Sequence, residues 1–184
     1  MDLNGKFLIA MPALSDPRFE RAVVLICSHS PRGAMGVIIN KPLDGLDFGD
    51  LLEQLAVARD QRARPVPVHF GGPVEPGRGF VLHDASWRSQ HGTTVMGEGL
   101  AMTATQEILV ELGHGRGPGR AILALGYAGW GPHQLESEIG RNDWLTSDAY
   151  SDLVFGAHNE GKWTAALARL KVDPLSLSAE AGRA

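Results

Sequence analysis

The sequence of 184 residues has little cysteine: Cys27 is the single one, so no disulfide can form within the chain. A lone thiol suits a reducing compartment, and the first residues lack the basic segment and apolar stretch of a signal peptide. The longest apolar run, residues 22–27, is far shorter than the roughly 20 residues needed to cross a bilayer. We therefore expect a cytoplasmic protein without membrane contact.

Basic residues are also few. The chain has 17 Lys and Arg against 21 Asp and Glu, a formal net charge of −4. Nucleic-acid binders usually need a basic excess because they neutralise phosphates. The densest basic stretch, 59–64, contains Asp60 and is typical of a polar loop. Direct DNA binding is therefore not expected. The partner that we expect is a protein or a small ligand, and the oligomeric state stays open.

Motifs of common catalytic and metal sites are missing as well. The seven histidines are irregularly spaced, with no His-Glu-x-x-His, and no Gly-x-Ser-x-Gly occurs. The glycine-rich stretch 113–120 lacks the Lys-Ser/Thr of a phosphate-binding loop and follows a predicted helix, which favours a plain connection. We therefore assign no catalytic residue and expect neither a metal nor a cofactor.

Apolar patterning predicts a chain in which strands and helices are mixed. Strands are predicted at 7–11, 22–27, 34–39, 68–74, 78–83, 93–96 and 120–127. Helices are predicted at 47–55, from a capping box at 103–106 to 112, at 132–139 and after Asn159. Short connections favour antiparallel pairing of 22–27 with 34–39, and a hairpin is one pairing open to 68–74 and 78–83.

These elements predict an α/β protein of the α+β type: a single domain, 1–184, with a mixed, largely antiparallel β-sheet covered by helices. Several strand connections are too short for the crossovers of an all-parallel sheet. The tail, 174–184, is small and polar, so we expect it to be flexible.

Five segments together resemble one protein family. They are 7–17 (FLIAMPALSDP), 33–42 (GAMGVIINKP), 71–74 with 78–83 (GGPV and RGFVLH), 126–136 (GYAGWGPHQLE) and 142–145 (NDWL). In this order and spacing they resemble the YqgE/AlgH family, also called UPF0301 or DUF179, over nearly the whole chain. The resemblance implies a bacterial cytosolic protein with a mixed sheet, often labelled a transcriptional regulator, and no established activity. The family usually has Gly where this chain has His133, and stretch 154–161 also departs from its pattern.

The strongest candidate site is segment 126–136. A buried strand is expected to end at Tyr127, and Pro132 to begin a helix after a glycine-containing turn. Ligands often bind at such strand-to-helix turns, and an exposed Trp130 would be a good recognition anchor. The alternative is that Tyr127 and Trp130 pack into the core, with the glycines allowing close approach to another element.

Two weaker candidates lie elsewhere. The glycine-rich loop 71–79 could bind an anion or shape a cleft, or it could simply need glycine for a tight turn. Cys27 and His29, at i and i+2 of a strand, would share a face and could form a nucleophile with its base. The alternative is that Cys27 is a small buried core residue.

The leading interpretation is a non-enzymatic binding or regulatory protein. The alternative is a small-molecule-binding protein or enzyme using the cleft near 126–136, with Glu136, His83 or His29 as acid–base groups. The predicted functional surface consists of Asn40, Lys41, Gly71, Gly72, Arg78, His83, Tyr127, Trp130, Gln134 and Glu136.

Overall fold

One curled, mixed sheet organises the chain in the computed structural model, which describes residues 1–97 and 99–177. Its strand order is β6-β7-β5-β8-β3-β2-β1-β9, and β4 lies beside β8. The strands are β1 Lys6–Ala10, β2 Val23–Ser30, β3 Gly33–Ile38, β4 Val68–Phe70, β5 Val74–Asp84, β6 Thr93–Val95, β7 Leu100–Thr103, β8 Ala121–Trp130 and β9 Trp144–Asp148. All the pairings are antiparallel except that of β4 with β8.

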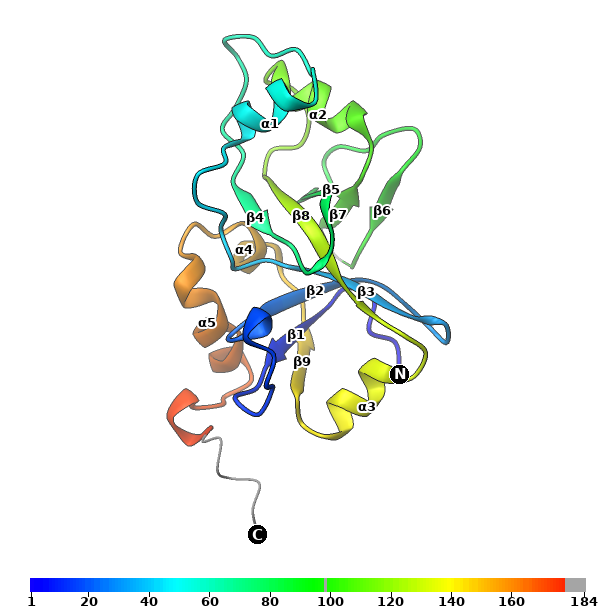
Figure 1. Ribbon diagram of the computed structural model, residues 1–184, viewed down its shortest axis with the longest axis vertical. Helices are drawn as coiled ribbons and strands as arrows, with labels where there is room; N and C mark the ends of the chain where they lie inside the picture. The colour runs from blue at the N-terminus through cyan, green and yellow to red at the C-terminus, as the bar shows by residue number, and fades with distance from the viewer. Residues whose placement is uncertain (98, 178–184) are drawn as a thin grey trace.

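The helices are short and lie around this sheet (Figure 1). They are α1 Phe48–Gln54, α2 Gln106–Gly113, α3 Gln134–Gly140, α4 Ser151–Phe155 and α5 Lys162–Arg169, with 3₁₀ turns η1 Pro17–Phe19, η2 Asn159–Gly161 and η3 Pro174–Ser176. Within the described residues, no helix combines the length and apolarity that crossing a membrane would require.

Strand β8 joins the two halves of the molecule. Its first part pairs with β4 on one edge and β5 on the other, whereas its end, up to Trp130, pairs with β3. Figure 1 shows β8 running from the half that carries α1 and α2 to the half that contains β1, β2 and β3. The sheet is therefore continuous through β8.

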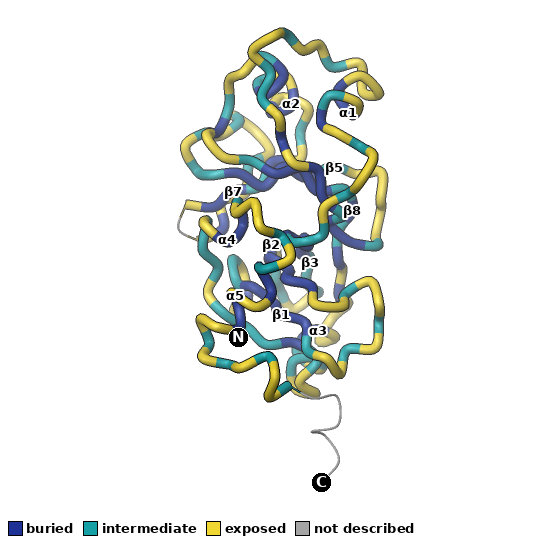
Figure 2. The backbone as a smooth tube through the Cα atoms, turned by 90° about the vertical axis from the view of Figure 1, so that its left-hand side faces the viewer, coloured by how far each residue is buried: buried dark blue, intermediate teal, exposed yellow. Residues whose placement is uncertain are grey.

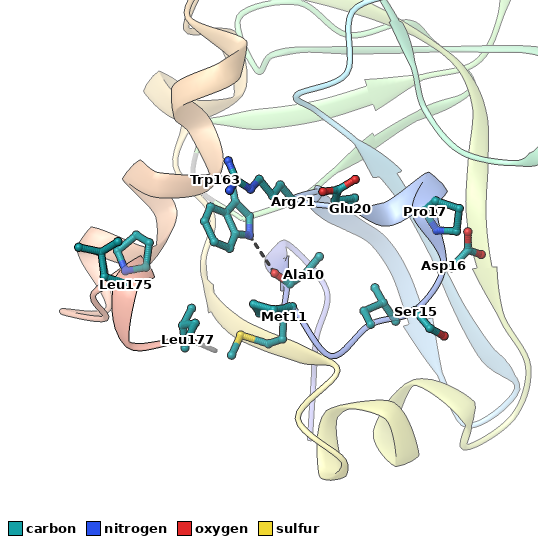
Figure 3. Close-up of a pocket in the computed structure, with 13 residues that line it drawn as sticks. Ala10, Met11, Ser15, Asp16, Pro17, Glu20, Arg21, Trp163, Leu175 and Leu177 are labelled. Atoms are coloured by element: carbon teal, nitrogen blue, oxygen red, sulfur yellow. Dashed lines mark hydrogen bonds between the residues drawn. The ribbon is translucent and has the colours of Figure 1, made fainter. Parts of the chain in front are cut away.

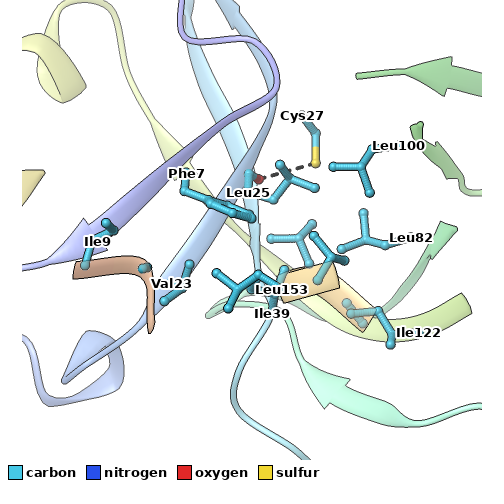
Figure 4. Packing of buried hydrophobic residues seen from close by; sticks show 14 of the residues in the cluster. Phe7, Ile9, Val23, Leu25, Cys27, Ile39, Leu82, Leu100, Ile122 and Leu153 are labelled. Carbon is cyan, nitrogen blue, oxygen red and sulfur yellow. Dashed lines mark hydrogen bonds between the residues drawn. The ribbon is translucent and has the colours of Figure 1, made fainter. Parts of the chain in front are cut away.

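Buried apolar side chains form clusters on both faces of the sheet. Figure 2 shows that the buried residues are concentrated in the central strands. One cluster packs Phe7, Leu25 and neighbours against α4 and α5, and it reaches Leu82 and Ile122 in the other half (Figure 4). On the opposite face, Leu135 of α3 packs over β1 and β2. A third cluster lies under α1 and α2. The continuous apolar runs 22–27 and 34–39 are thus explained by strands covered on both sides.

The predicted fold class is confirmed, as is the antiparallel pairing of β2 with β3. The helix expected at 47–55 is α1, where Asp47 and Asp50 form a reciprocal capping box. Trp163, Ala166 and Leu167 form the buried stripe expected for the last helix.

The hairpin considered for 68–74 and 78–83 is wrong. Strands β4 and β5 do not pair with each other but lie on opposite edges of β8. Local sequence could not reveal this arrangement, because the strand between them is some 40 residues further along the chain.

The capping box expected at 103–106 is also wrong. Thr103 ends strand β7, where its hydroxyl contacts His83, and α2 starts at Gln106 without a side-chain cap. The helical pattern after residue 106 does correspond to α2, but the sequence did not predict strand β7 before it. Strand β9 and helix α4 were missed too.

The strand expected to end at Tyr127 continues to Trp130, so Gly129 lies in β8 rather than in a turn. Pro132 is not the first helical residue. It lies in a turn that the backbone N–H of Gln134 closes by donating to the Gly131 carbonyl at 3.1 Å, and His133 occupies its left-handed position with φ of 61°.

The C-terminal tail is only partly described. Residues 174–177 form η3 and its cap, and Leu177 packs against the core cluster around Phe7. The rest of the segment for which flexibility was expected, 178–184, lies outside the described residues.

The shared face predicted for Cys27 and His29 is wrong, whereas the alternative, Cys27 as a small buried core residue, is confirmed. A β-bulge at Cys27 shifts the register of β2 against β3, so the two side chains no longer share a face. Cys27 lies in the core, where its thiol contacts the Leu25 carbonyl, and burial raises the pKa of that thiol to about 12. Such a thiol is a poor nucleophile at neutral pH.

Candidate functional site

The loop of residues 11–21, which connects β1 to β2, has a cavity on each side. Asp16 caps η1 inside this loop by accepting from the Arg18 backbone N–H at 3.0 Å. The Arg18 guanidinium also donates to the Asp16 carboxylate, and these hydrogen bonds lower the pKa of Asp16. Asp16 is therefore a structural anion that shapes the loop.

The first cavity, which we call the C-terminal cavity, has a volume of about 500 Å³ and lies between the 11–21 loop and the C-terminal segment. Figure 3 shows Leu175 and Leu177 at one end of the lining and Asp16 at the other, with Met11 and Trp163 between them. The Trp163 indole N–H donates to the Ala10 carbonyl at 2.8 Å, which fixes the ring.

The second cavity, the indole cavity, has a volume of about 360 Å³ and lies between the same loop and the end of β8. Trp130, Trp144 and Phe19 contribute aromatic walls, and Pro73 and Val74 line it from the start of β5. Leu14 and Asp16 line both cavities. The indole cavity thus joins parts of segments 71–79 and 126–136, the two segments that the sequence singled out.

The Glu138 carboxylate holds the wall of the indole cavity together. One of its oxygens accepts from the indole N–H groups of Trp130 and Trp144, both at 2.9 Å, and the other accepts from Gln134 at 2.9 Å. The Gln134 side-chain oxygen accepts from the Gly131 backbone N–H. Buried polar groups are thereby satisfied, and α3 is tied to β8 and β9.

Trp130 is consequently not an exposed recognition anchor. Its residue is 7% exposed and belongs to the core cluster beneath α3. Its ring meets that of Trp144 edge to face at 6.0 Å between centroids. A buried indole N–H needs a hydrogen-bond partner, and the Glu138 carboxylate provides one. This contact allows the Trp130 ring to be buried. The alternative reading of this residue, as part of the core, is the correct one.

Glu136 points to a different partner. Its carboxylate lies 2.8 Å from His29 Nε2, and the other ring nitrogen of His29 accepts from the Leu3 backbone N–H at 3.4 Å. The Glu136 backbone N–H and then His29 lower the pKa of this carboxylate. The pair joins α3 to β2, and both ring nitrogens of His29 are engaged.

Asn40 and Lys41 act on the backbone of the 11–21 loop. Asn40 accepts from the Val23 N–H at 2.9 Å and donates to the Arg21 carbonyl at 2.8 Å. Lys41 Nζ donates to the Glu20 carbonyl at 2.9 Å. These predicted site residues therefore position the turn at the edge of the C-terminal cavity.

Gly71 and Gly72 are buried where two strands approach closely. A Cβ on Gly71 would lie 2.3 Å from the Gly126 carbonyl oxygen, and one on Gly72, with φ of 153°, would lie 2.1 Å from the Tyr127 carbonyl carbon. These glycines are required by packing against β8, so they belong to no exposed functional surface.

Three other predicted site residues lie outside both cavities. His83 is fully buried, so the prediction that it belongs to a functional surface was wrong. Its Nδ1 donates to the Asp84 carbonyl, and its Nε2 accepts from the Thr103 hydroxyl. Burial lowers the pKa of His83. Tyr127 is half-buried against Phe80, at 5.8 Å between ring centroids. Arg78 is exposed, with its guanidinium 5.1 Å from the centre of the Phe80 ring.

Sequence reasoning missed Glu138, Trp144 and the loop residues that line both cavities. Glu138 is four residues after Gln134 on α3, so the helical spacing contained a signal for that pair. Nothing local indicated that two distant indoles would share its carboxylate.

Within the described residues, no group of three or more His, Cys, Asp or Glu side chains is placed to hold a metal ion. Both cavities have mixed walls, in which apolar and aromatic side chains lie beside polar and charged ones. Such surfaces are suited to binding an organic group.

Comparison with known proteins gives a consistent match. A family model described as AlgH-like matches residues 7–175. A UPF0301 protein of Cereibacter sphaeroides is 54% identical over 184 residues that cover 100% of both chains. A UPF0301 protein of Paracoccus denitrificans is also 54% identical, over 100% of this chain and 97% of its own.

Two solved structures share the fold. The solution structure of the AlgH protein from Pseudomonas aeruginosa has a TM-score of 0.80 and 41% identity, covering 99% of this chain and 96% of its own. A crystal structure of a Corynebacterium diphtheriae protein has a TM-score of 0.71 at 22% identity, covering 96% and 90%, and supports the fold alone. None of these descriptions states a ligand or a reaction.

Proposed function

The chain belongs to the AlgH-like family, and from that premise we propose that it is a cytoplasmic, non-enzymatic binding protein. Its binding site is the indole cavity, and its ligand is a segment of a partner protein that inserts an aromatic or aliphatic side chain. The proposal requires no direct contact with DNA, in keeping with the net charge of −4.

The observation that carries this proposal is the saturated polar wall of the cavity. Glu138 already accepts three hydrogen bonds, and Asp16 is occupied by Arg18. A carboxylate that is fully engaged in this way is poorly suited to move protons. The rest of the wall consists of apolar and aromatic side chains, among them Trp130 and Trp144 in edge-to-face contact. A preformed wall of this kind lowers the cost of ordering side chains on binding.

The rim of the cavity favours a side chain from a protein. Val74 is 36% exposed, Leu14 and Phe19 are half-buried, and together they continue the apolar surface outward from the two indoles. An apolar side chain entering here would displace water from apolar surface without breaking the hydrogen bonds of Glu138. Arg18 and Asp16 supply a polar rim.

Site-specific photocrosslinking tests the proposal. A photoreactive amino acid replaces Val74 in one variant and Val110 in another, because Val110 has a similar exposed fraction, 40% against 36%, but lies on α2. We expect cells that express the Val74 variant to yield a discrete crosslinked protein that is absent for Val110.

The affinity of the identified partner is then measured for the wild type, Val74→Asp and Val110→Asp. An Asp at the rim should weaken binding at least tenfold, and Val110→Asp should leave the affinity unchanged. Identical crosslinked products at the two positions, or equal affinities of the three proteins, would show that the indole cavity is not the binding site.

A second candidate is an enzyme that uses His29 and Glu136, since the structure brings these two side chains within 2.8 Å. A panel of p-nitrophenyl esters and phosphates tests it. Turnover that is lost in Glu136→Gln but kept in Glu107→Gln, a change at an exposed residue of α2, would favour the enzyme over the binding protein.

A further inference from the structure

We propose that the C-terminal cavity is a second binding site, for an apolar monocarboxylate: a hydrocarbon chain or ring of roughly six to ten carbon atoms that ends in one carboxylate. This inference concerns a different cavity from the one in the proposed function, and each can fail without the other.

Arg21 supplies the cation for the carboxylate. It lines the cavity and is exposed, and its guanidinium carbon lies 5.3 Å from the centre of the Trp163 ring. Figure 3 shows the Arg21 side chain beside that ring. Among the ion pairs of the described residues, none involves Arg21. A guanidinium stacked on an indole keeps its planar edge available for a carboxylate, which it can bind through two parallel hydrogen bonds.

The backbone around Arg21 is held in a costly conformation. Its φ is 50°, in the left-handed region that residues other than glycine rarely occupy. Asn40 binds the Arg21 carbonyl and Lys41 binds the Glu20 carbonyl, at 2.8 and 2.9 Å. Strained backbone that neighbouring side chains hold in place is a frequent feature of binding sites. Here it positions the Arg21 side chain over Trp163.

The walls of the cavity suit the hydrocarbon part. Met11, Leu14 and Leu175 line it together with Trp163. The indole N–H of Trp163 is already bonded to the Ala10 carbonyl, so the ring offers an apolar face to a ligand. The volume of about 500 Å³ lies in the range of small-molecule sites.

The charged side chains that line the cavity are Arg21, Asp16 and Glu20. Asp16 is paired with Arg18, which lies outside the lining. Arg21 is therefore the group in the lining that the carboxylate of a ligand would meet.

Calorimetric titration with hexanoate, octanoate and decanoate tests this site, with octanol and octylamine as head-group controls. We expect saturable binding whose affinity rises about fourfold for each added CH₂, the factor that corresponds to roughly 0.8 kcal/mol. Octanoate should bind at least tenfold more tightly than either control.

Two pairs of variants separate the head-group and hydrocarbon contacts. Arg21→Gln should weaken the binding of octanoate at least tenfold, to the affinity measured for octanol. Arg78→Gln changes an exposed arginine that lies over Phe80, and it should leave the affinity for octanoate unchanged. Leu175→Asp should abolish binding, and because Leu175 is 92% exposed this variant should fold normally; Val110→Asp is its control.

The inference is overturned by any of three results: no saturable binding of octanoate, equal affinity for octanoate and octylamine, or equal effects of Arg21→Gln and Arg78→Gln. Failure here would leave the crosslinking at Val74 unaffected, because that residue lines only the indole cavity.

Discussion

At the scale of the residue, His133 shows how a backbone angle selects a side chain. It is the third residue of the turn that leads from β8 into α3, and its φ of 61° is a value that glycine adopts at little cost. This gives a physical reason for the glycine that the family resemblance leads one to expect there. Histidine is tolerated because it is one of the residues enriched in the left-handed region.

His133→Gly should therefore raise the free energy of unfolding by a few tenths up to about 1 kcal/mol, and His133→Val should lower it by roughly 1–2 kcal/mol. Urea unfolding measures both. The control is Ser137→Gly, inside α3, which should instead lower the free energy of unfolding by about 0.5 kcal/mol. A loss of stability in His133→Gly would contradict the turn geometry.

Lys162 is a second residue with unusual surroundings. It is buried at the start of α5, and its ammonium donates to the carbonyls of Ile39 and Val154, both at 2.9 Å, rather than to a carboxylate. Burial lowers its pKa to about 8. The charge also helps to lower the pKa of buried His69 to about 4, although desolvation is the larger cause there.

Stability should consequently rise between pH 8 and 10.5. In this window the unfolded chain keeps the Lys162 proton and the folded chain releases it, so the free energy of unfolding increases with pH, by up to about 3 kcal/mol. Urea unfolding at several pH values should show this rise in wild type and in Lys171→Met, an exposed control. Lys162→Met should lack it, and a parallel rise in all three proteins would refute the assignment.

At the scale of the element, the sequence predicted what each segment is better than what it pairs with. Apolar runs located β1, β2, β3 and most of β8, and helical spacing located α1 and α5. The edge strand β9 has a half-buried pattern, too weak to stand out as an apolar run. The neighbours of β4 and β5 depend on β8, so no local pattern could specify them.

The candidate site was predictable to a similar extent. Segments 71–79 and 126–136 do meet at the indole cavity. They stood out in the sequence because their glycines, prolines and aromatic residues indicate where the chain turns and packs closely. The roles within it were not predictable. Whether Trp130 is exposed depends on Glu138 and on Trp144 of β9, and these contacts exist only in the folded chain.

Helix α3 is held to the sheet through Glu138, so Glu138→Gln should lower the free energy of unfolding by about 2 kcal/mol. An amide can still accept from both indoles, but its NH₂ would then face the NH₂ of Gln134. Urea unfolding gives the magnitude, and the indole N–H resonances of Trp130 and Trp144 should shift. Unchanged resonances and stability, equal to those of Glu107→Gln, would refute this role.

At the scale of the whole molecule, β8 makes the two halves interdependent. It contributes strand pairs to both, and the core cluster around Phe7 and Leu82 spans them. Gly72 lies where the chain returns against β8, and Gly126 of β8 faces it with φ of 75°. A disturbance at this crossing should therefore be felt by the entire fold.

Gly72→Ala should lower the free energy of unfolding by about 3 kcal/mol or more, because the new methyl group would overlap the Tyr127 main chain. Unfolding monitored in both halves should shift together. Gly77→Ala is the matched control: a Cβ there meets no atom within 4 Å, so stability should stay the same or rise slightly. Equal stabilities of the two variants would contradict the close crossing.

The 11–21 loop is a partition with one face in each cavity, since Leu14 and Asp16 line both. If a ligand in one cavity displaced this loop, the shape of the other cavity would change with it. By thermodynamic reciprocity, a small acid that moved the loop would alter the affinity for a protein segment by the same factor as the segment alters the affinity for the acid.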